Sequence, residues 1–292
     1  MSVSWAGGDR YEVRLGQGVL RYREVGSGPA LVFVHGLLVN GVLWRDVVSE
    51  LSGRFRCVLP DLPLGGHAVP MPGADLSPRG VARLVAEFVE ALDLRDVTLV
   101  GNDTGGAVCQ IVITEHPGRI GRLVLTNCDA YEAFLPWQLR LFQYGPRLFG
   151  QRFVDVLARV LRARSAQRLL LKTVAKRRMD EATLDAYFGD LIRDAGVRGD
   201  VTRFLQQISN RETLEAARRF SRFRRPVLIV WGEDDYFFLP RYARRLAGDF
   251  PEARLRFVRG SRAFVPEDQP QALARCIEDF VPSEIGVPAG DG

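Results

Sequence analysis

The fold of this chain is decided by the stretch VTLVGNDTGG, residues 97–106. Its first half is an apolar run that predicts a buried strand, and its second half matches the pattern G-x-S-x-G with aspartate in place of serine. The pattern is typical of a sharp turn that exposes its central side chain, here Asp103, while Gly105 and Gly106 let the next helix pack closely. A carboxylate there indicates attack on an sp3 carbon rather than on a carbonyl carbon. A turn aspartate without chemistry is the alternative interpretation.

Strand and helix patterns alternate on both sides of this turn. Strands are predicted at residues 11–15, 19–24, 31–34, 56–59, 97–100, 122–126, 226–231 and 254–258. Helices are predicted at residues 42–51, 107–115, 241–246 and 271–280, and another begins at Pro78 with Ser77 as its N-cap. These patterns predict the α/β class, with a mostly parallel eight-stranded sheet flanked by helices.

The alternation stops between residues 129 and 219, where only helical patterns occur. We therefore expect a core built from residues 1–128 and 220–282, interrupted once by a helical cap over residues 129–219. Residues 283–292 contain glycine and proline without a periodic pattern, and we expect them to form a flexible tail.

Composition places the chain among globular proteins with one substantial core, because 47% of its 292 residues are hydrophobic. The formal net charge is +5, but residues 140–178 hold eleven basic side chains and one acidic one, a local net charge of +10. Such a segment can meet an anionic substrate, a membrane surface or nucleic acid, or it can be the solvated face of an arginine-rich chain. No nucleic-acid-binding motif accompanies it, which argues against nucleic acid as a partner.

The four cysteines are scattered in apolar patterns without disulfide or zinc spacing, so we expect reduced core residues and no metal site. The N-terminus has no signal-peptide pattern, and no apolar stretch reaches membrane-spanning length. We therefore expect a cytoplasmic protein without a transmembrane segment. The sequence leaves a homodimer open.

Four landmarks follow one another along the chain: His35-Gly36, the turn at Asp103, WGEDD at residues 231–235 and FVPEDQP at residues 264–270. In this order they resemble the haloalkane dehalogenase and epoxide hydrolase branch of the α/β-hydrolases, over nearly the whole chain. The resemblance implies the α/β-hydrolase fold with an inserted helical cap, no cofactor, and the chain order nucleophile, acid, histidine.

The same resemblance assigns roles to individual residues. Asp103 matches the nucleophile, and Asp235 matches the acid better than its neighbour Asp234 does. Capping of the following helix is the alternative role for Asp235. The oxyanion hole would consist of the backbone N–H groups of Leu37 and Thr104.

The chain departs from the family at the catalytic histidine, because the matching position is Ala263. A methyl group cannot take a proton from water, and general-base help is worth about 10²–10⁴-fold, so an alkyl ester on Asp103 would be cleaved slowly or not at all. Of the three histidines, we expect His35 to be structural and His116 to close a helix at the surface. His67, on a loop near the mouth of the site, is the candidate replacement base.

The residues that would bind a leaving group also differ from the family. Haloalkane dehalogenases hold the halide with a tryptophan after the nucleophile and a second aromatic or amide donor, whereas this chain has Thr104 and Leu37 at those positions. Epoxide hydrolases use cap tyrosines to protonate the opening oxygen. Tyr131, Tyr144 and Tyr187 are the candidates here, and packing of the cap on the sheet is the alternative role of each.

The aromatic-rich cap suits a small-molecule substrate that is bulky and apolar or polycyclic, and packing of these aromatics between the cap and the core is the alternative. The candidate substrate contacts are His35, His67, Tyr131, Trp137, Tyr144 and Tyr187. Three functions remain open: an epoxide-hydrolase-like enzyme whose second step is disabled, a non-hydrolytic isomerase, cyclase or lyase that uses Asp103 as acid and base, and a ligand-binding protein without activity.

Overall fold

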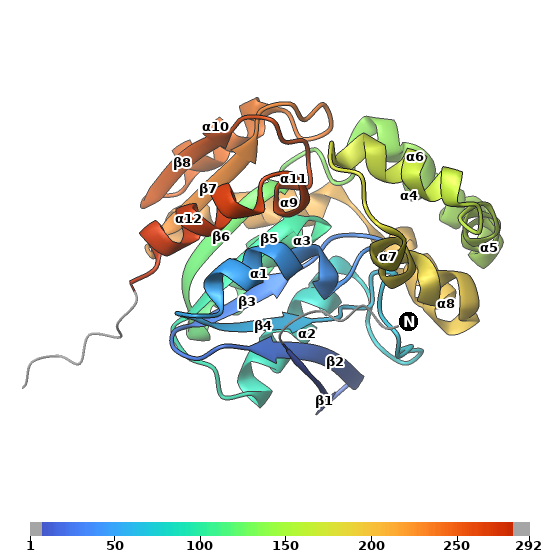
Figure 1. The fold of residues 1–292 in the computed structure, drawn as a ribbon, viewed down its shortest axis with the longest axis horizontal. Helices are drawn as coiled ribbons and strands as arrows, with labels where there is room; N and C mark the ends of the chain where they lie inside the picture. The colour runs from blue at the N-terminus through green and yellow to red at the C-terminus, as the bar shows by residue number, and fades with distance from the viewer. Residues whose placement is uncertain (1–7, 283–292) are drawn as a thin grey trace, which may run out of the picture.

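A single sheet organises the computed structural model, which describes residues 8–282 (Figure 1). Its eight strands lie in the order β1-β2-β4-β3-β5-β6-β7-β8. β1 pairs with β2 and β2 with β4 in antiparallel fashion, whereas all other neighbours are parallel. The strands are β1 Asp9–Leu15, β2 Gly18–Val25, β3 Ala30–Val34, β4 Arg56–Pro60, β5 Val97–Asp103, β6 Ile120–Cys128, β7 Val227–Gly232 and β8 Ala253–Val258. The predicted α/β class and the mostly parallel sheet are confirmed.

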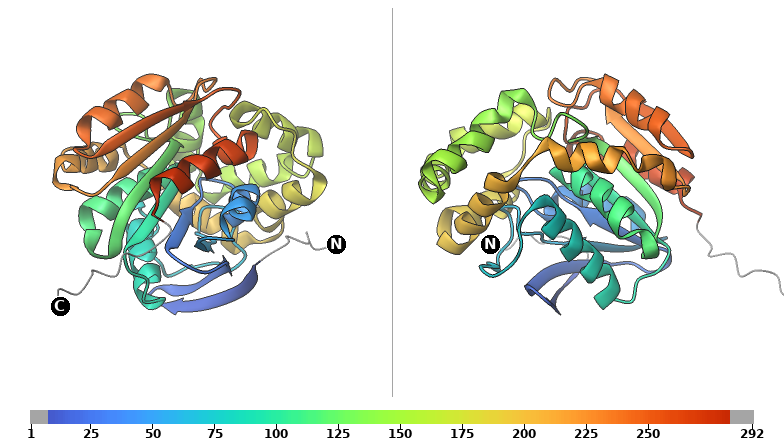
Figure 2. Two further views of the ribbon diagram at one scale, coloured as in Figure 1. Left: turned by 60° about the vertical axis from the view of Figure 1, so that its left-hand side comes forward. Right: turned by 180° about the vertical axis from the view of Figure 1, so that it is seen from behind.

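Helices cover both faces of the sheet. On the face nearest the viewer in Figure 1 lie α1 Arg45–Leu51, the short α11 Val265–Asp268 and α12 Pro270–Phe280. The view from behind in Figure 2 shows the helices of the other face, which are α2 Pro78–Ala91, α3 Thr104–Glu115, α9 Asn210–Ala217 and α10 Pro240–Asp249. The sheet is therefore buried on both sides, as its continuous apolar strands require.

A separate helical layer lies at one end of the sheet, on the right in Figure 1. It follows β6 in the chain and consists of α4 Arg140–Phe149, α5 Gln151–Val160, α6 Arg164–Val174, α7 Glu181–Arg193 and α8 Ala195–Gln207. We call these five helices the helical layer. The parallel strands β3, β5, β6 and β7 end toward this layer, so residues at their carboxyl ends lie beneath it.

The ends of several elements differ from the sequence-based predictions. The helix expected from residue 42 begins as a 3-10 turn over Gly41–Trp44, where the Asn40 side chain accepts a hydrogen bond from the Val42 N–H. β5 runs on to Asp103 instead of ending at Val100, because its last residues still pair with β6. The prediction for α2 is confirmed: Ser77 caps it, with Pro78 in the first turn.

The two edge strands carry charged, exposed side chains. β1 is exposed over most of its length, and in β8 the exposed positions include Arg254 and Arg256. The central strands differ completely, since Leu31–Val34 of β3 are inaccessible to solvent.

Within residues 8–282, no helix is long and apolar enough to cross a membrane. The four cysteines are free thiols, and Cys57, Cys109 and Cys128 are buried. The expected tail at residues 283–292 lies outside the described residues.

Candidate active site

Asp103 is the last residue of β5 and lies in a strained backbone conformation, with φ 55° and ψ −133°. Such a conformation costs of order 1–3 kcal/mol and persists only where the surrounding structure fixes it. Glycines make the turn sterically feasible. A Cβ atom on Gly36 would lie 2.2 Å from Asp103 Oδ2, and one on Gly105 would lie 2.3 Å from the Val34 carbonyl oxygen. The predicted sharp turn is thus present, with the Asp103 carboxylate against the backbone of Gly36.

The Asp103 carboxylate is bound by the two backbone groups named as the oxyanion hole. The Leu37 N–H donates to Asp103 Oδ2 at 3.2 Å, and the Thr104 N–H also favours the ionised form. Burial outweighs these hydrogen bonds and raises the pKa of Asp103 to about 7, with a smaller contribution from the charge of Asp235. The neutral form of this carboxyl group is therefore favoured relative to that of an exposed aspartate.

A small apolar cavity of about 70 Å³ lies over Asp103. Asp103 is the only ionisable residue among those that line it. The others come from the loop after β3, the segment after β6, α4, α6, α7 and the start of α11, and are Leu37, Leu38, Val39, Leu135, Leu139, Phe142, Leu170, Leu171, Thr173, Val174, Phe188 and Phe264. A carboxyl group on the floor of an apolar cavity is poorly solvated, which explains the direction of its pKa shift.

Asp235 lies in the turn after β7 and is buried. The Asn127 side chain donates to its Oδ2 at 2.8 Å, and the Phe237 N–H donates to its Oδ1 at 2.8 Å. Burial raises the pKa of Asp235 to about 6 against these hydrogen bonds. The neighbouring Asp234 points outward and forms an ion pair with Lys176. The structure therefore turns Asp235, not Asp234, toward the interior.

Ala263 is fully buried between the core and the helical layer. The Asn102 side chain donates to the Ala263 carbonyl oxygen at 2.8 Å, and the next N–H, that of Phe264, donates to the Val174 carbonyl oxygen at 2.8 Å. The loop is thus fixed on both sides, and its side chain at this position is a methyl group. No side chain that could take a proton from water stands there.

The three histidines do not line the Asp103 cavity. The His35 ring lies between the Gly36 carbonyl oxygen at 2.9 Å and the Leu62 N–H, which donates to its Nε2 at 2.8 Å. Its pKa is lowered to about 4, chiefly by burial, so the ring is neutral and acts in the loop structure. His67 Nε2 lies 3.1 Å from Asp200 Oδ2 in α8 and links a core loop to the helical layer. His116 is half-buried at the end of α3.

The cap aromatics proposed as substrate contacts also lie away from Asp103. The Tyr131 hydroxyl donates to Asp249 Oδ2 at 2.8 Å, and the Tyr187 hydroxyl donates to Glu267 Oε1 at 2.5 Å. Tyr144 is half exposed, and Trp137 is 73% exposed. None of these side chains lines the cavity, so packing and surface positions account for them in this structure.

Sequence reasoning missed a second carboxyl group near the turn, that of Asp129. It is fully buried after β6, and its Oδ2 accepts a hydrogen bond from the Thr104 hydroxyl at 3.1 Å. Its Oδ1 has no hydrogen-bond partner within residues 8–282. Burial and the nearby Asp103 raise its pKa well above the usual range. The sequence could have indicated this residue. Asp129 follows the predicted strand 122–126, and the carboxyl end of that strand lies beside the end of the strand that carries Asp103.

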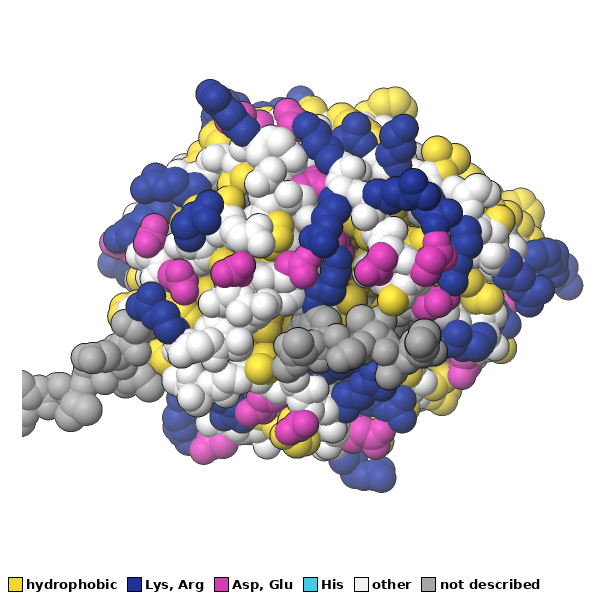
Figure 3. Space-filling view, in the orientation of Figure 1, with side chains coloured by type: hydrophobic (Ala, Val, Ile, Leu, Met, Phe, Trp, Pro, Cys, Tyr) yellow, Lys and Arg dark blue, Asp and Glu magenta, His cyan; other side chains and the backbone are white. Residues whose placement is uncertain are grey.

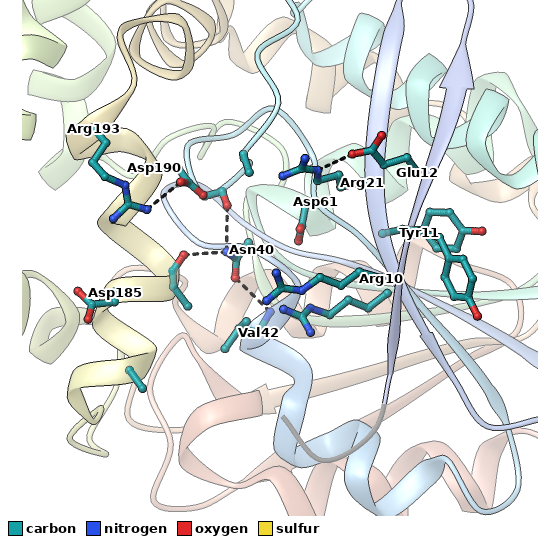
Figure 4. Close-up of a pocket in the computed structure, with 16 residues that line it drawn as sticks. Arg10, Tyr11, Glu12, Arg21, Asn40, Val42, Asp61, Asp185, Asp190 and Arg193 are labelled. Atoms are coloured by element: carbon teal, nitrogen blue, oxygen red, sulfur yellow. Dashed lines mark hydrogen bonds and ion pairs between the residues drawn. The ribbon is translucent and has the colours of Figure 1, made fainter. Parts of the chain in front are cut away.

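A larger cavity of about 830 Å³ lies between helix α7 and the edge strand β1 with its neighbour β2 (Figure 4). Arginines and carboxylates of both elements surround it, and Asn40 bridges it by donating to the Gly66 and Ala186 carbonyl oxygens. Burial raises the pKa of Asp61 in its wall to about 6. Asp103 does not line this cavity. The volume of this larger cavity is therefore not evidence about the reaction at Asp103.

Metal chemistry has no evident site in the described part of the chain. Within residues 8–282, no three or more His, Cys, Asp and Glu side chains are grouped so that they could hold a metal ion.

Known proteins resemble the chain over most of its length. The sequence model of the alpha/beta hydrolase fold family matches residues 29–270. Haloalkane dehalogenase 2 of Mycobacterium tuberculosis is 28% identical over 268 residues, which cover 89% of this chain and 91% of that protein. Epoxide hydrolase 2 of Caenorhabditis elegans is 24% identical over 294 residues, covering 93% and 80%. The solved structure of Cfl2 from Burkholderia cenocepacia has a TM-score of 0.81 at 23% identity, covering 96% of this chain and 98% of that one.

The fold, the turn at Asp103 and the family match agree. The chain belongs to the alpha/beta hydrolase fold family, and the similarity to haloalkane dehalogenases and epoxide hydrolases inferred from its four landmarks is confirmed.

Proposed function

We propose that this protein is an enzyme of the epoxide hydrolase and haloalkane dehalogenase type, in which Asp103 attacks an sp3 carbon of a small apolar substrate under a cap built from the helical layer. One observation carries the proposal. The Asp103 carboxylate is held through Oδ2 by the Leu37 N–H on the floor of an otherwise apolar cavity. In the proposed reaction Oδ1 attacks, and the apolar walls keep this nucleophile poorly solvated.

The first step forms a covalent ester. Oδ1 of ionised Asp103 bonds to the substrate carbon, while the carbon–halogen bond or one epoxide C–O bond breaks. A halide leaves, or the opened epoxide oxygen takes a proton from water. Oδ2 becomes the carbonyl oxygen of the ester and stays near the Leu37 N–H, and the Thr104 N–H also lies against this carboxyl group.

The second step, hydrolysis of the ester, lacks its base. The methyl group of Ala263 cannot activate water, and the three histidines are engaged elsewhere or lie outside the cavity. Because general-base catalysis is worth about 10²–10⁴-fold, the ester should accumulate.

Mass spectrometry of intact protein incubated with simple epoxides and haloalkanes tests this proposal. We expect a stable gain of one substrate equivalent that maps to the peptide with Asp103 and is absent in Asp103→Asn. Ala263→His should shorten the lifetime of the ester, provided that the variant folds as judged by circular dichroism. If a broad panel of electrophiles leaves Asp103 unmodified, the proposal is wrong.

A second candidate function is favoured by the raised pKa of Asp103 and by the buried carboxyl group of Asp129 close to the turn. Asp103 would then exchange a proton with the substrate in an isomerisation, cyclisation or elimination, without forming an ester. Turnover in H₂¹⁸O distinguishes the two candidates. Incorporation of ¹⁸O into the product would exclude the proton-exchange reaction.

A further inference from the structure

The outward side of α4–α6 exposes large apolar side chains. Each of the following is more than half exposed: Trp137, Leu141, Leu148, Phe149, Val156, Val160 and Leu169. We call this surface, between residues 137 and 172, the α4–α6 face. Soluble monomers rarely expose so many large apolar side chains together, so such a surface indicates an interaction.

The helical spacing places these side chains on the solvent side. In α4, Leu141 and Leu148 lie seven residues apart, and in α5 Val156 and Val160 lie four apart, so each pair shares one side of its helix. Other residues of α4 and α6, such as Phe142 and Leu171, instead line the cavity over Asp103. The exposed apolar residues therefore do not belong to the set that packs the helical layer on the core.

Basic side chains lie among the apolar ones on the same helices. Arg152 and Arg159 are exposed in α5, Arg162 follows it, and Lys172 is exposed in α6. The one acidic residue of the segment, Asp155, is paired with Arg198 of α8. In Figure 3, dark-blue and yellow side chains mix along the right-hand margin, where Figure 1 places these helices. Within residues 8–282, no carboxylate forms an ion pair with these four basic side chains.

We infer that the α4–α6 face docks on an anionic lipid bilayer. Apolar side chains can enter the boundary between headgroups and acyl chains, while arginines and lysines meet the lipid phosphates. A second copy of this chain fits less well, because it would bring two strongly basic surfaces together without carboxylates between them. A nucleic acid would satisfy the arginines but would leave the leucines and valines in water. The inference does not depend on the reaction at Asp103.

Sedimentation with vesicles tests the docking. We expect the full chain to bind vesicles of phosphatidylcholine with about one-third phosphatidylglycerol, and to bind pure phosphatidylcholine weakly. Binding should weaken at about 1 M salt, where the Debye length falls to about 3 Å. Each arginine near such a surface contributes about 1 kcal/mol, so the triple variant Arg152→Gln, Arg159→Gln, Arg162→Gln should lower the partition coefficient roughly 100-fold.

A matched control removes charge at the far end of the sheet. Arg254→Gln combined with Arg256→Gln in β8 should leave vesicle binding within about threefold, because these exposed side chains lie away from the α4–α6 face. Leu148→Ser combined with Val156→Ser should reduce binding without changing the melting temperature, since both side chains are exposed. Equal loss in the β8 control would overturn the inference, as would the absence of binding to anionic vesicles.

Tryptophan fluorescence gives an independent readout. Trp44 and Trp231 are fully buried, whereas Trp137 is exposed at the start of the α4–α6 face. In a Trp5→Phe background, where Trp44, Trp137 and Trp231 remain, we expect the emission to shift to the blue when anionic vesicles are added, and Trp137→Phe to abolish the shift. If Trp137→Phe keeps the full shift, another surface contacts the lipid and the inference is wrong. Concentration-dependent self-association through the same face, without vesicle binding, would also overturn it.

Discussion

At the scale of single residues, the environment of Asp103 gives its carboxyl group two competing tendencies. The N–H groups of Leu37 and Thr104 favour the ionised form, whereas the apolar walls of the cavity favour the neutral one. Burial is the larger effect. The result is a carboxyl group that changes its charge near neutral pH, unlike an exposed aspartate.

Replacement of Asp103 by asparagine should therefore stabilise the fold in a pH-dependent way. The pKa of Asp103 is raised from 3.8 to about 7, so the folded state holds its proton more tightly than the unfolded state does. The contribution of Asp103 to the free energy of unfolding is complete below about pH 4 and is lost as the pH rises to about 7. We expect Asp103→Asn to raise the free energy of unfolding by a few kcal/mol at pH 8, at ~1.4 kcal/mol per pKa unit, and to change it little at pH 4.

Urea denaturation at the two pH values measures this effect. Asp279→Asn, at an exposed position of α12, is the matched control and should change the unfolding free energy equally at both. A destabilised Asp103→Asn protein at pH 8 would contradict the argument from burial.

The rate of ester formation should follow the same titration. Only the ionised carboxylate attacks, so the rate of adduct formation should rise with pH and level off above about pH 7. Mass spectrometry at short incubation times across pH 5–9 measures the profile. A rate that falls as the pH rises through 7 would show that the protonated form reacts, which favours the acid and base role instead.

At the scale of elements, a buried ion pair joins α7 to α1 and α11. Arg45 donates to both oxygens of Glu267 at 2.5 and 2.8 Å, and the Tyr187 hydroxyl donates to the same carboxylate. Removing one partner of such a pair leaves the other charge buried and unpaired. The three side chains therefore act together as a fixed contact between the helical layer and the core.

Two variants of this contact test whether its residues stabilise the fold or take part in the reaction. Glu267→Ala should lower the free energy of unfolding by up to about 3–5 kcal/mol, because it removes the bidentate partner of the Arg45 guanidinium and leaves Asp46, 3.7 Å away, as its remaining carboxylate. Tyr187→Phe removes one hydrogen bond to a charged group and should cost about 1.5–3 kcal/mol. Adduct formation should stay within a few-fold in Tyr187→Phe. Its loss in a protein that remains folded would show that Tyr187 contacts the substrate.

A second contact holds the segment after α6 against the loop of Ala263. Asp268 Oδ1 accepts from the N–H groups of Lys176 and Arg177 at 2.7 and 2.8 Å, and Oδ2 accepts from the Arg262 N–H at 2.9 Å. We expect Asp268→Ala to speed hydrogen exchange at these three amides at least tenfold, because their acceptor is gone. Asp279→Asn serves as the control. Unchanged exchange would mean that other contacts hold the segment.

At the scale of the whole molecule, the sequence predicted the sheet and the turn but not the contacts across the helical layer. Apolar runs such as Leu31–Val34 identify buried strands because each is short, continuous and flanked by turn residues. The link between His67 and Asp200 joins residues 133 positions apart. No local sequence pattern predicts such a pair. From the sequence alone, His67 could therefore be interpreted as a catalytic base, although it joins a core loop to the helical layer.

The small volume of the cavity over Asp103 sets an expectation for substrate size. A volume of about 70 Å³ is well below the roughly 300–1,000 Å³ of sites for drug-sized ligands. We expect epoxides of a few carbon atoms to modify Asp103 at least tenfold faster than polycyclic ones, measured as initial rates of adduct formation. Equal rates would show that the helical layer opens widely before reaction. In Asp268→Ala, the difference between the rates of adduct formation with small and large epoxides should be smaller.

The charged margins of the sheet have a consequence for molecules at high concentration. A bare strand can template the addition of a strand from another chain, which is a common route to fibres. If two copies joined through β8, Arg254 and Arg256 of each would be brought close to those of the other. Repulsion between these guanidinium groups opposes such polymerisation. Even at high concentration, the molecules should therefore remain separate instead of joining their sheets through β8.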